Sequence, residues 1–312
     1  MTCNTKLLIN KLKIYFYPEE LIAFSFTVIV LTLQIILILQ GKIISYSEFI
    51  QLIIAFIIFL AFILFARKRI GRTVLFLRTY LHIPYYGIIF TAYESYLHKL
   101  NPTDWDWLLL KADYALFGFD VTVWLQKFNS ALLTEVLIIS YFSYYVLPTL
   151  SAVVFYFILK QTNSYENLRR FILTLLIGWY AAFVFYTALP AAGPDIVFPE
   201  HYSTTLKGLS PLTNYYLETV TTYLKTSEVR NTFPSMHFAI ILMINFFALK
   251  WSKKYFLFCT LPLGTGLAIA TLYLRQHYMI DLVGSVFIAW FSVWVGKLIL
   301  KREIKRGVFN PS

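Results

Sequence analysis

Long apolar runs recur along the chain, separated by short polar or irregular segments. A transmembrane helix needs about 20 mostly apolar residues, and eight stretches approach or exceed that length. They cover residues 21–40, 49–66, 74–93, 133–159, 171–189, 234–248, 255–274 and 279–299. The pattern predicts an all-α, polytopic helical membrane protein with about eight spans. The third run is the most polar and aromatic, so we expect it to be buried among other helices.

Composition supports the same class of protein. Hydrophobic residues make up 59% of the 312 and charged residues 14%, whereas soluble domains have about half and a quarter. An outer-membrane barrel would instead show short alternating segments. The two cysteines, Cys3 and Cys259, form no Cys-rich metal pattern. We find no internal repeat of the kind that marks solenoids and many transporters.

The basic residues predict how the spans are oriented. Of the 27 Lys and Arg residues, 18 lie in one set of span flanks. These flanks are the N-terminal arm, 67–72, 160–170, 250–254 and 297–306. Because cytoplasmic flanks carry the excess of Lys and Arg, we expect both termini to be cytoplasmic. The formal charge of +11 is then positive-inside flanking, and no nucleic-acid partner is needed to explain it.

Two segments on the opposite, extracytoplasmic side are longer than ordinary connections. Residues 101–129 interleave Trp and Tyr with charged residues, which is typical of short helices lying in the membrane interface. Residues 187–232 begin with a Pro- and Gly-rich turn, which predicts an irregular loop. Loops on a helical scaffold often carry function.

The candidate chemistry lies where these loops enter the last spans. His277 and Asp281 are four residues apart, so a helix would place both on one face. A carboxylate beside an imidazole can fix its tautomer and stabilise its positive charge. We expect the sixth span to begin at Pro234, with Asn231 or Thr232 as its cap and His237 in its first turn. The topology brings both histidines, together with Arg230 and Arg275, to one membrane face.

Structural explanations compete with these functional ones. An isolated interfacial histidine often contacts lipid head groups, and Arg230 or Arg275 could extend toward lipid phosphates. Asp281 is harder to explain in this way, because an ionisable group inside an apolar span is costly and usually paired or functional. His and Asp could bind a metal, but no further ligand stands at a matching spacing. We therefore expect no metal and no cofactor.

These residues resemble the motifs of the type 2 phosphatidic acid phosphatase superfamily. Its second motif, Pro-Ser-Gly-His, matches residues 234–237 except at Met236, and its third ends in His-x-x-x-Asp, as at His277 and Asp281. The resemblance covers about residues 101–300 and implies a six-helix catalytic core. It also implies that His277 attacks phosphorus to form a phosphohistidine, that Asp281 orients it, and that His237 protonates the leaving oxygen.

Within that superfamily the sequence is most similar to the branch containing inositol phosphorylceramide synthase. That branch has Phe-Pro-Ser-x-His, as at 233–237, a Pro-rich turn like 189–194, and Thr six residues before the third-motif His, here Thr271. Many bacterial members show an Asp to Leu-Phe-Gly pattern like 113–118. The phosphatases have Arg where Thr271 stands, and bacterial relatives often have Arg where Asp195 follows Gly193-Pro194.

The resemblance implies a lipid phosphate phosphatase, or a head-group phosphotransferase, acting in the bilayer at the extracytoplasmic face. The acceptor would be water or a lipid or polyol hydroxyl. We expect Ser235, Arg275, Arg230 and Thr271 to bind the substrate. Residues 1–100 would form the first three spans, and residues 101–312 the catalytic membrane domain. Two alternatives stay open: a non-enzymatic transporter, and a family member that has lost catalysis, as Asp195 and Met236 would allow.

Overall fold

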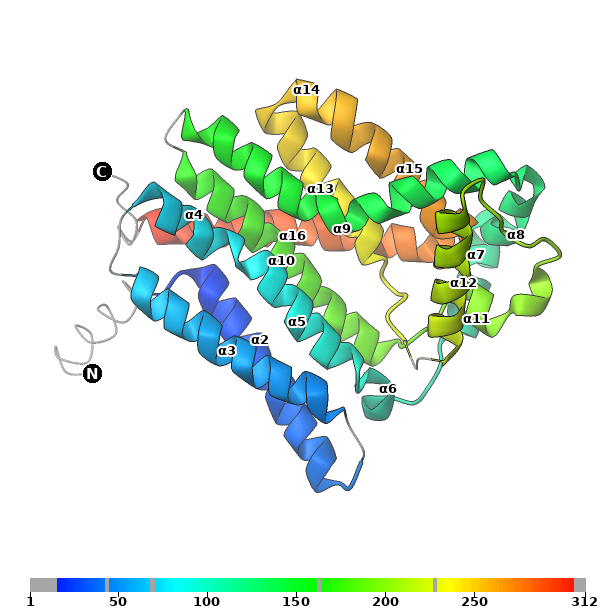
Figure 1. The fold of residues 1–312 in the computed structure, drawn as a ribbon, viewed down its shortest axis with the longest axis horizontal. Coiled ribbons are helices and arrows are strands. Elements are labelled where there is room, and N and C mark those ends of the chain that lie inside the picture. Colours follow the sequence, from blue (N-terminus) through cyan, green and yellow to red (C-terminus); the bar gives the residue numbers. More distant parts are fainter. Residues whose placement is uncertain (1–15, 43–44, 68–70, 162–163, 227–228, 306–312) are drawn as a thin grey trace. The chain divides into compact units, whose positions relative to one another are not determined.

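The computed structural model describes residues 16–42, 45–67, 71–161, 164–226 and 229–305. This part of the chain is helical and contains no strand beyond an isolated bridge between Ala191 and Asn231 (Figure 1). The all-α prediction is therefore confirmed. Within these described ranges, six helices are long and apolar enough to cross a membrane: α2 (Pro18–Leu39), α3 (Tyr46–Ala66), α9 (Ala131–Lys160), α10 (Tyr165–Ala188), the continuous helical segment Lys253–Tyr273, and α16 (Met279–Lys305).

The other two predicted spans are shorter helices. The run 74–93 is divided at Leu81 into α4 (Arg72–Tyr80) and α5 (His82–Glu94). Pro84 explains the break, because a proline inside a helix removes one hydrogen bond and clashes with the carbonyl four residues earlier. The run 234–248 forms α13 (Met236–Trp251), a helix of 16 residues. The number of eight spans therefore stays a prediction.

The chain forms two compact units. The first comprises Met1–Tyr93, Ser151–Ile177 and Ser292–Ser312, and the second comprises Glu94–Leu150 and Gly178–Phe291. The long helices α9, α10 and α16 each contribute to both units. The division of the sequence at residue 100 into membrane spans and a catalytic domain stays a prediction.

A buried ionic cluster lies inside the first unit. Arg169 pairs with Glu19 (Nε–Oε1, 2.7 Å) and Glu303 (Nη2–Oε2, 3.0 Å), while Arg78 pairs with Glu20. All five side chains are buried. Removing one member of such a pair typically costs about 3–5 kcal/mol, because the remaining charge stays buried without compensation. The cluster joins α2 to α4, α10 and α16.

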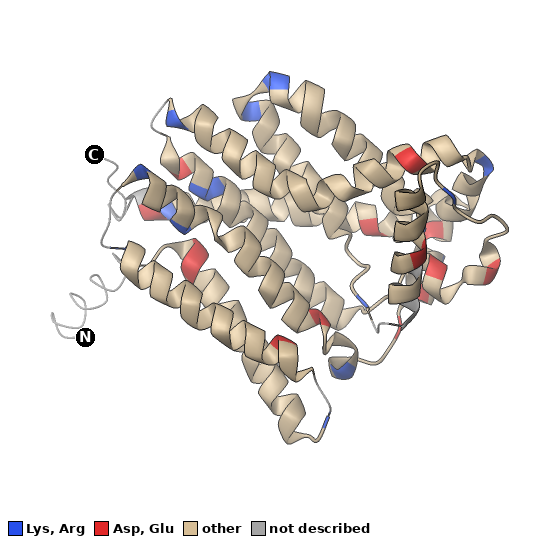
Figure 2. Cartoon of the chain, in the orientation of Figure 1, with Lys and Arg blue, Asp and Glu red and all other residues tan. Residues whose placement is uncertain are grey.

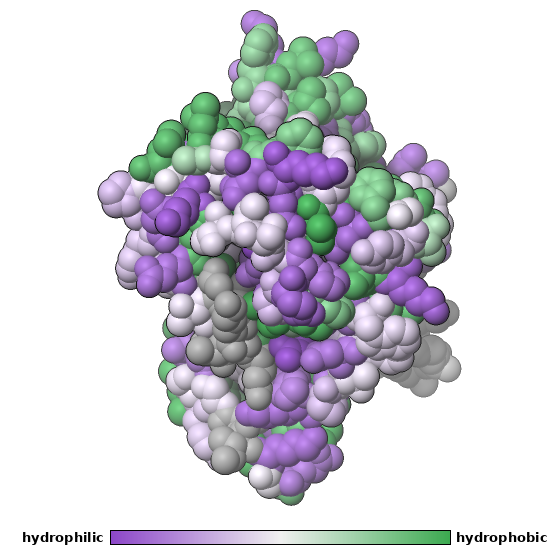
Figure 3. Space-filling model, turned by 90° about the vertical axis from the view of Figure 1, so that its right-hand side faces the viewer, coloured by the Kyte–Doolittle hydropathy of each residue, from purple (hydrophilic) through white to green (hydrophobic). Residues whose placement is uncertain are grey.

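The second unit holds every residue of the candidate site. Besides parts of α9, α10 and α16, it contains these elements: α6 (Leu97–Leu100), α7 (Asp106–Phe117), α8 (Val121–Leu125), η1 (Gln126–Phe128), α11 (Pro194–Val197), η2 (Pro199–His201), α12 (Pro211–Thr226), α13, α14 (Lys253–Tyr255), η3 (Phe256–Thr260) and α15 (Leu261–Tyr273). Carboxylates gather around α7, α8 and α11, whereas lysines follow the far end of α13 (Figure 2). The face in Figure 3 is dominated by hydrophilic and intermediate residues.

Candidate active site

His277 and Asp281 are in contact, but one helix does not carry both. Helix α16 begins at Met279, so His277 precedes it, and the expectation of a shared helical face was wrong. Asp281 lies in the first turn and is fully buried. Its Oδ2 accepts the N–H of Tyr278 (2.8 Å) and lies 3.1 Å from Nδ1 of His277. The carboxylate therefore caps the helix start and orients the imidazole at once.

His237 meets the other nitrogen of the same imidazole. Its Nδ1 lies 3.2 Å from Nε2 of His277. Helix α13 begins at Met236 with Ser235 as its N-cap, not at Pro234 as expected. The N–H of Ser235 instead donates to the carbonyl of Asp281 (3.3 Å), which joins the starts of α13 and α16. The result is a continuous line of carboxylate, imidazole and imidazole.

Two tyrosines of α9 hold the ring of His237. The ring centroid of Tyr141 lies 4.8 Å from that of His237 in a stacked arrangement, and that of Tyr144 lies 4.2 Å away at an angle of 44°. Among the described residues, three buried polar atoms around the two histidines have no hydrogen-bond partner: Ser235 Oγ, His237 Nε2 and Asp281 Oδ1; the same holds for Nε of Arg275. Buried polar atoms are usually paired, so such a cluster can receive the polar groups of a ligand.

Helix α7 provides a carboxylate that caps the first N–H groups of α16. The two carboxylate oxygens of Asp113 accept the N–H groups of Met279 (2.8 Å) and Ile280 (2.7 Å). A negative charge at a helix N-terminus is favourable. The pKa of Asp113 is nevertheless raised to about 6, because burial outweighs these two hydrogen bonds. The sequence had shown Asp113 only as part of a pattern, without this role.

A second carboxylate of α7 holds the irregular loop that follows α10. Asp106 accepts the N–H groups of Ala192 (3.0 Å) and Gly193 (2.8 Å) and the hydroxyl of Tyr278 (2.9 Å). Sequence reasoning missed Asp106. Its spacing of seven residues from Asp113, two helical turns on one face, was the signal that could have identified both as a pair.

Gly193 is required by the close approach of this loop to the residue preceding His277. Its φ is +102°, and a Cβ there would lie 2.8 Å from the carbonyl oxygen of Gln276. Arg275 also has a positive φ, of 61°. Non-glycine residues adopt this conformation only where the surroundings hold them in it.

Arg275 is held by an extensive set of contacts. Its Nη2 donates to the carbonyl of Thr204 (2.6 Å), its Nη1 lies 3.4 Å from Oδ1 of Asp195, and its guanidinium lies 4.1 Å above the ring of Tyr202. Asp195, which stands where bacterial relatives often have Arg, is therefore paired with a cation. Among the described residues, the buried Nε of Arg275 has no partner.

Thr271 and Arg230 have different surroundings from the other predicted residues. Thr271 is fully buried near the end of α15, and its carbonyl accepts the N–H groups of Gln276 (3.0 Å) and His277 (3.2 Å). Arg230 pairs with Asp104, whose side chain is 42% exposed. The carbonyl of Thr271 thus contacts the backbone of His277, whereas Arg230, 16% exposed, is in an ion pair with an exposed carboxylate.

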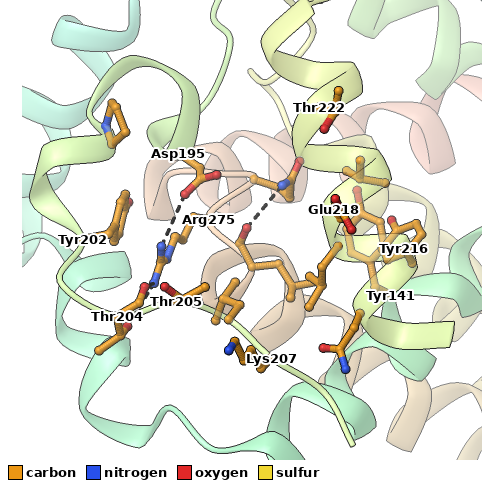
Figure 4. Close-up of a pocket in the computed structure, with 17 residues that line it drawn as sticks. Tyr141, Asp195, Tyr202, Thr204, Thr205, Lys207, Tyr216, Glu218, Thr222 and Arg275 are labelled. Atoms are coloured by element: carbon orange, nitrogen blue, oxygen red, sulfur yellow. Dashed lines mark hydrogen bonds and ion pairs between the residues drawn. The ribbon is translucent and has the colours of Figure 1, made fainter. Parts of the chain in front are cut away.

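A pocket of about 810 Å³ is lined by residues next to the two histidines, although neither histidine lines it. Leu274, Arg275 and Gln276, immediately before His277, form part of its wall. Tyr141, which stacks on His237, also lines it, together with hydroxyl and charged side chains from the loop before α12 and from α12 itself (Figure 4). The volume suits a small-molecule head group.

The surroundings of His277 favour its neutral form. Burial lowers the pKa of His277 well below its usual value, and the neighbouring His237 lowers it further, while a hydrogen bond with the backbone of Thr232 opposes both effects. Neutral imidazole has the free lone pair that a nucleophile or base needs. Among the described residues no group of three or more His, Cys, Asp or Glu could hold a metal ion; that none is required stays a prediction.

Glu94 gives the second unit a testable dependence on pH. It accepts a hydrogen bond from Nδ2 of Asn231 (2.6 Å), and burial raises its pKa to about 7. An unfolded Glu titrates near 4.3, so between about pH 4.3 and pH 7 the folded state binds a proton that the unfolded state lacks. Stability therefore falls as pH rises through this window.

Glu94→Gln should remove that loss, because glutamine stays neutral and keeps the acceptor oxygen. We expect the variant to match the wild type at pH 5 and to be more stable by about 2 kcal/mol at pH 8. Thermal unfolding of the purified protein in detergent at both pH values measures this. Glu200→Gln, at an exposed position, is the control. An equal shift at both pH values would contradict this origin.

Taken together, the fold and the site define a class: a helical membrane protein in which a buried carboxylate orients one of two hydrogen-bonded histidines. The chain belongs to the PAP2 superfamily, whose family model matches residues 108–295. The resemblance of the motifs to this superfamily is thereby confirmed, whereas the particular branch stays a prediction. Members of the superfamily are generally phosphatases, which supports an enzyme.

A curated relative matches most of the length of this chain. A PA-phosphatase related-family protein of Dictyostelium discoideum is 23% identical over 237 residues, which is 70% of this chain and 42% of that protein. The chain thus spans less than half the length of this relative. No solved structure gives a significant match.

Proposed function

We propose that the protein is an integral membrane phosphatase or phosphotransferase that acts on a lipid phosphate ester through a phosphohistidine at His277. The observation that carries this proposal is the line from Asp281 through His277 to His237. When Nδ1–H of His277 donates to Asp281, Nε2 carries the lone pair, which can attack phosphorus once the phosphate replaces Nδ1 of His237 as its neighbour. That nitrogen is the one adjacent to His237, where an acid is needed.

The reaction then has two steps. In the first, Nε2 of His277 forms a bond to phosphorus and the bond from phosphorus to the lipid oxygen breaks. His237, which must be protonated for this step, gives its Nδ1 proton to that oxygen. In the second, neutral His237 takes a proton from the acceptor, whose oxygen bonds to phosphorus as the Nε2–P bond breaks. Asp281 stays ionised and keeps the imidazole in one tautomer.

Phosphoryl transfer also needs cationic and hydrogen-bonding groups around the phosphate oxygens. Ser235 Oγ and the N–H groups of the first turn of α13 can bind them, since a helix N-terminus favours an anion. Arg275 supplies the cation. Thr271 contributes by holding the backbone of His277, and Arg230, partly buried and paired with Asp104, adds positive charge near the site.

Head-group transfer is the second candidate, and the pocket beside the histidines favours it. A space of about 810 Å³, whose lining combines hydroxyl, amide and charged groups with apolar side chains, is far larger than a water molecule requires. Such a lining can hold a hydroxyl-bearing acceptor, as expected for the branch with inositol phosphorylceramide synthase. The distribution of basic residues supports an extracytoplasmic site and cytoplasmic termini.

The test uses the purified full-length protein in mixed micelles with phosphatidic acid, with and without EDTA. A phosphatase releases inorganic phosphate at the same rate in both. For the transferase, common phospholipids are offered as donors with a diacylglycerol or ceramide acceptor, and the new lipids are identified by mass spectrometry. No product from any donor would contradict both candidates and favour a transporter or a member that has lost catalysis.

A further inference from the structure

Helix α12 presents three different faces. Leu212 and Tyr215 are 77% and 68% exposed, and together with Leu209 (62%) and Tyr223 (53%) they form an outward apolar and aromatic stripe. The inward side carries buried or partly buried residues: Thr213, Tyr216, Leu217 and Val220. Between them lie Asn214, Glu218 and Thr222, which line the pocket together with Tyr216, Leu217 and Val220 of the inward side. In water, such an exposed apolar stripe would not contribute to the stability of the helix, because its side chains would stay hydrated.

The start of α12 is fixed to the beginning of α9. Glu135 of α9 accepts the N–H groups of Leu209 (2.9 Å) and Ser210 (3.1 Å) and the hydroxyl of Ser210 (2.7 Å). Further along, the ring of Tyr216 lies 4.5 Å from that of Phe142. These contacts hold α12 against a helix long and apolar enough to cross the membrane.

The part of α9 that α12 contacts has a lipid-facing surface of its own. Its exposed apolar residues recur at helical spacing: Leu132, Val136, Ile139, Phe142 and Val146. On a membrane-spanning helix such a stripe faces the acyl chains. Since Tyr216 rests on Phe142, the exposed stripe of α12 lies next to a surface that already meets lipid.

We infer that α12 lies in the lipid–water interface, with Leu212 and Tyr215 inserted into the bilayer surface. With 16 residues, several of them polar, it is too short and too polar to span. Amphipathic helices of this kind lie in the interface plane, and tyrosine is enriched there.

The position of α12 gives the pocket a route from the bilayer. Glu218 and Thr222 of this helix face the same pocket as Arg275 and Lys207 (Figure 4). One side of α12 would therefore touch lipid while another touches the space beside the histidines. This consequence rests on the proposed function: a lipid head group would enter the pocket at α12 without leaving the membrane.

The position of α12 can be measured without any turnover. In a background of Cys3→Ser and Cys259→Ala, single cysteines replace Leu212 or Tyr215, and Glu218 is the control on the pocket side of the same helix. Each full-length variant is labelled with bimane and reconstituted in phosphatidylcholine vesicles with or without brominated acyl chains. Ile139→Cys, on the lipid face of α9, gives the reference for contact with lipid.

We expect brominated lipid to quench the labels at 212 and 215 at least twofold more than the label at 218, with iodide quenching in the opposite order. Quenching of 212 and 215 by iodide alone would place the stripe in water and overturn the inference. Protection from both quenchers would indicate a protein partner, such as a second copy, and would also overturn it. Because the quenching experiment needs no enzymatic activity, it decides where α12 lies even if the proposed function is wrong.

The delivery role has a separate test. The double variant Leu212→Asp/Tyr215→Asp should hydrolyse long-chain phosphatidic acid in vesicles at least fivefold more slowly, with near wild-type rates on the water-soluble dioctanoyl form. An equal loss on both substrates would contradict delivery from the bilayer. Inactivity of the wild type on both would refute the phosphatase assignment, while the quenching result still decides where α12 lies.

Discussion

Replacing His277 by asparagine is expected to lower turnover of the lipid phosphate by at least about a thousandfold. Asparagine can accept a hydrogen bond from His237, but it has no ring nitrogen that can form a bond to phosphorus. Purified wild type and variant are compared for product formation from ³²P-labelled phosphatidic acid. Wild type quenched during turnover should also retain label on the protein that is stable to alkali and released by acid, and the variant should not.

Two variants make the test of His277 specific. His201→Ala changes an exposed histidine of the same unit and should keep near wild-type turnover. His237→Asn removes the acid but leaves the nucleophile, so it should still become labelled from a substrate with a good leaving group. Label that survives in His277→Asn would show that another residue is the nucleophile.

Asp281→Asn is expected to lower turnover by about 10²–10⁴-fold with little change in stability. The amide oxygen can still accept the N–H of Tyr278, so the start of α16 is kept. The amide NH₂ then faces Nδ1 of His277 and favours the tautomer with the proton on Nε2, which blocks attack. Turnover and thermal unfolding are measured on the same preparation, with Glu200→Gln as the matched exposed carboxylate.

A double-mutant comparison separates orientation of His277 from general damage. If Asp281 acts only through His277, adding Asp281→Asn to His277→Asn should cost little further activity. Additive losses would mean that Asp281 contributes independently. Near wild-type turnover in Asp281→Asn alone would show that the Asp281 carboxylate is not needed for catalysis.

The sequence predicted that His237, His277 and Asp281 lie close together, which the structure shows, but it did not predict how they meet. The spacing of His277 and Asp281 suggested a helix carrying both, yet the helix begins two residues after His277. They meet because the Asp281 side chain reaches back to cap the helix. Capping depends on where a helix starts, and boundaries are the least certain result of sequence reasoning.

Asp195 shows why the phosphate-binding groups could not be assigned from the sequence. Taken alone, a carboxylate in place of an expected arginine suggests repulsion of phosphate. In the folded chain its partner is Arg275, 80 residues away, held in turn by Thr204 and Tyr202. A charge can be interpreted only with its neighbours, and those neighbours come from separate loops.

By itself the sequence determined the helical membrane class, because a bilayer demands long apolar runs that any reader of the chain can see. It also determined the motif residues His237, His277 and Asp281. Only the tertiary structure decided that His237 meets Nε2 of His277, that Asp106 and Asp113 support the site from α7, and that α12 covers a pocket. Those contacts join segments distant in sequence through packing and hydrogen-bond geometry, which leave no periodic signal in the chain.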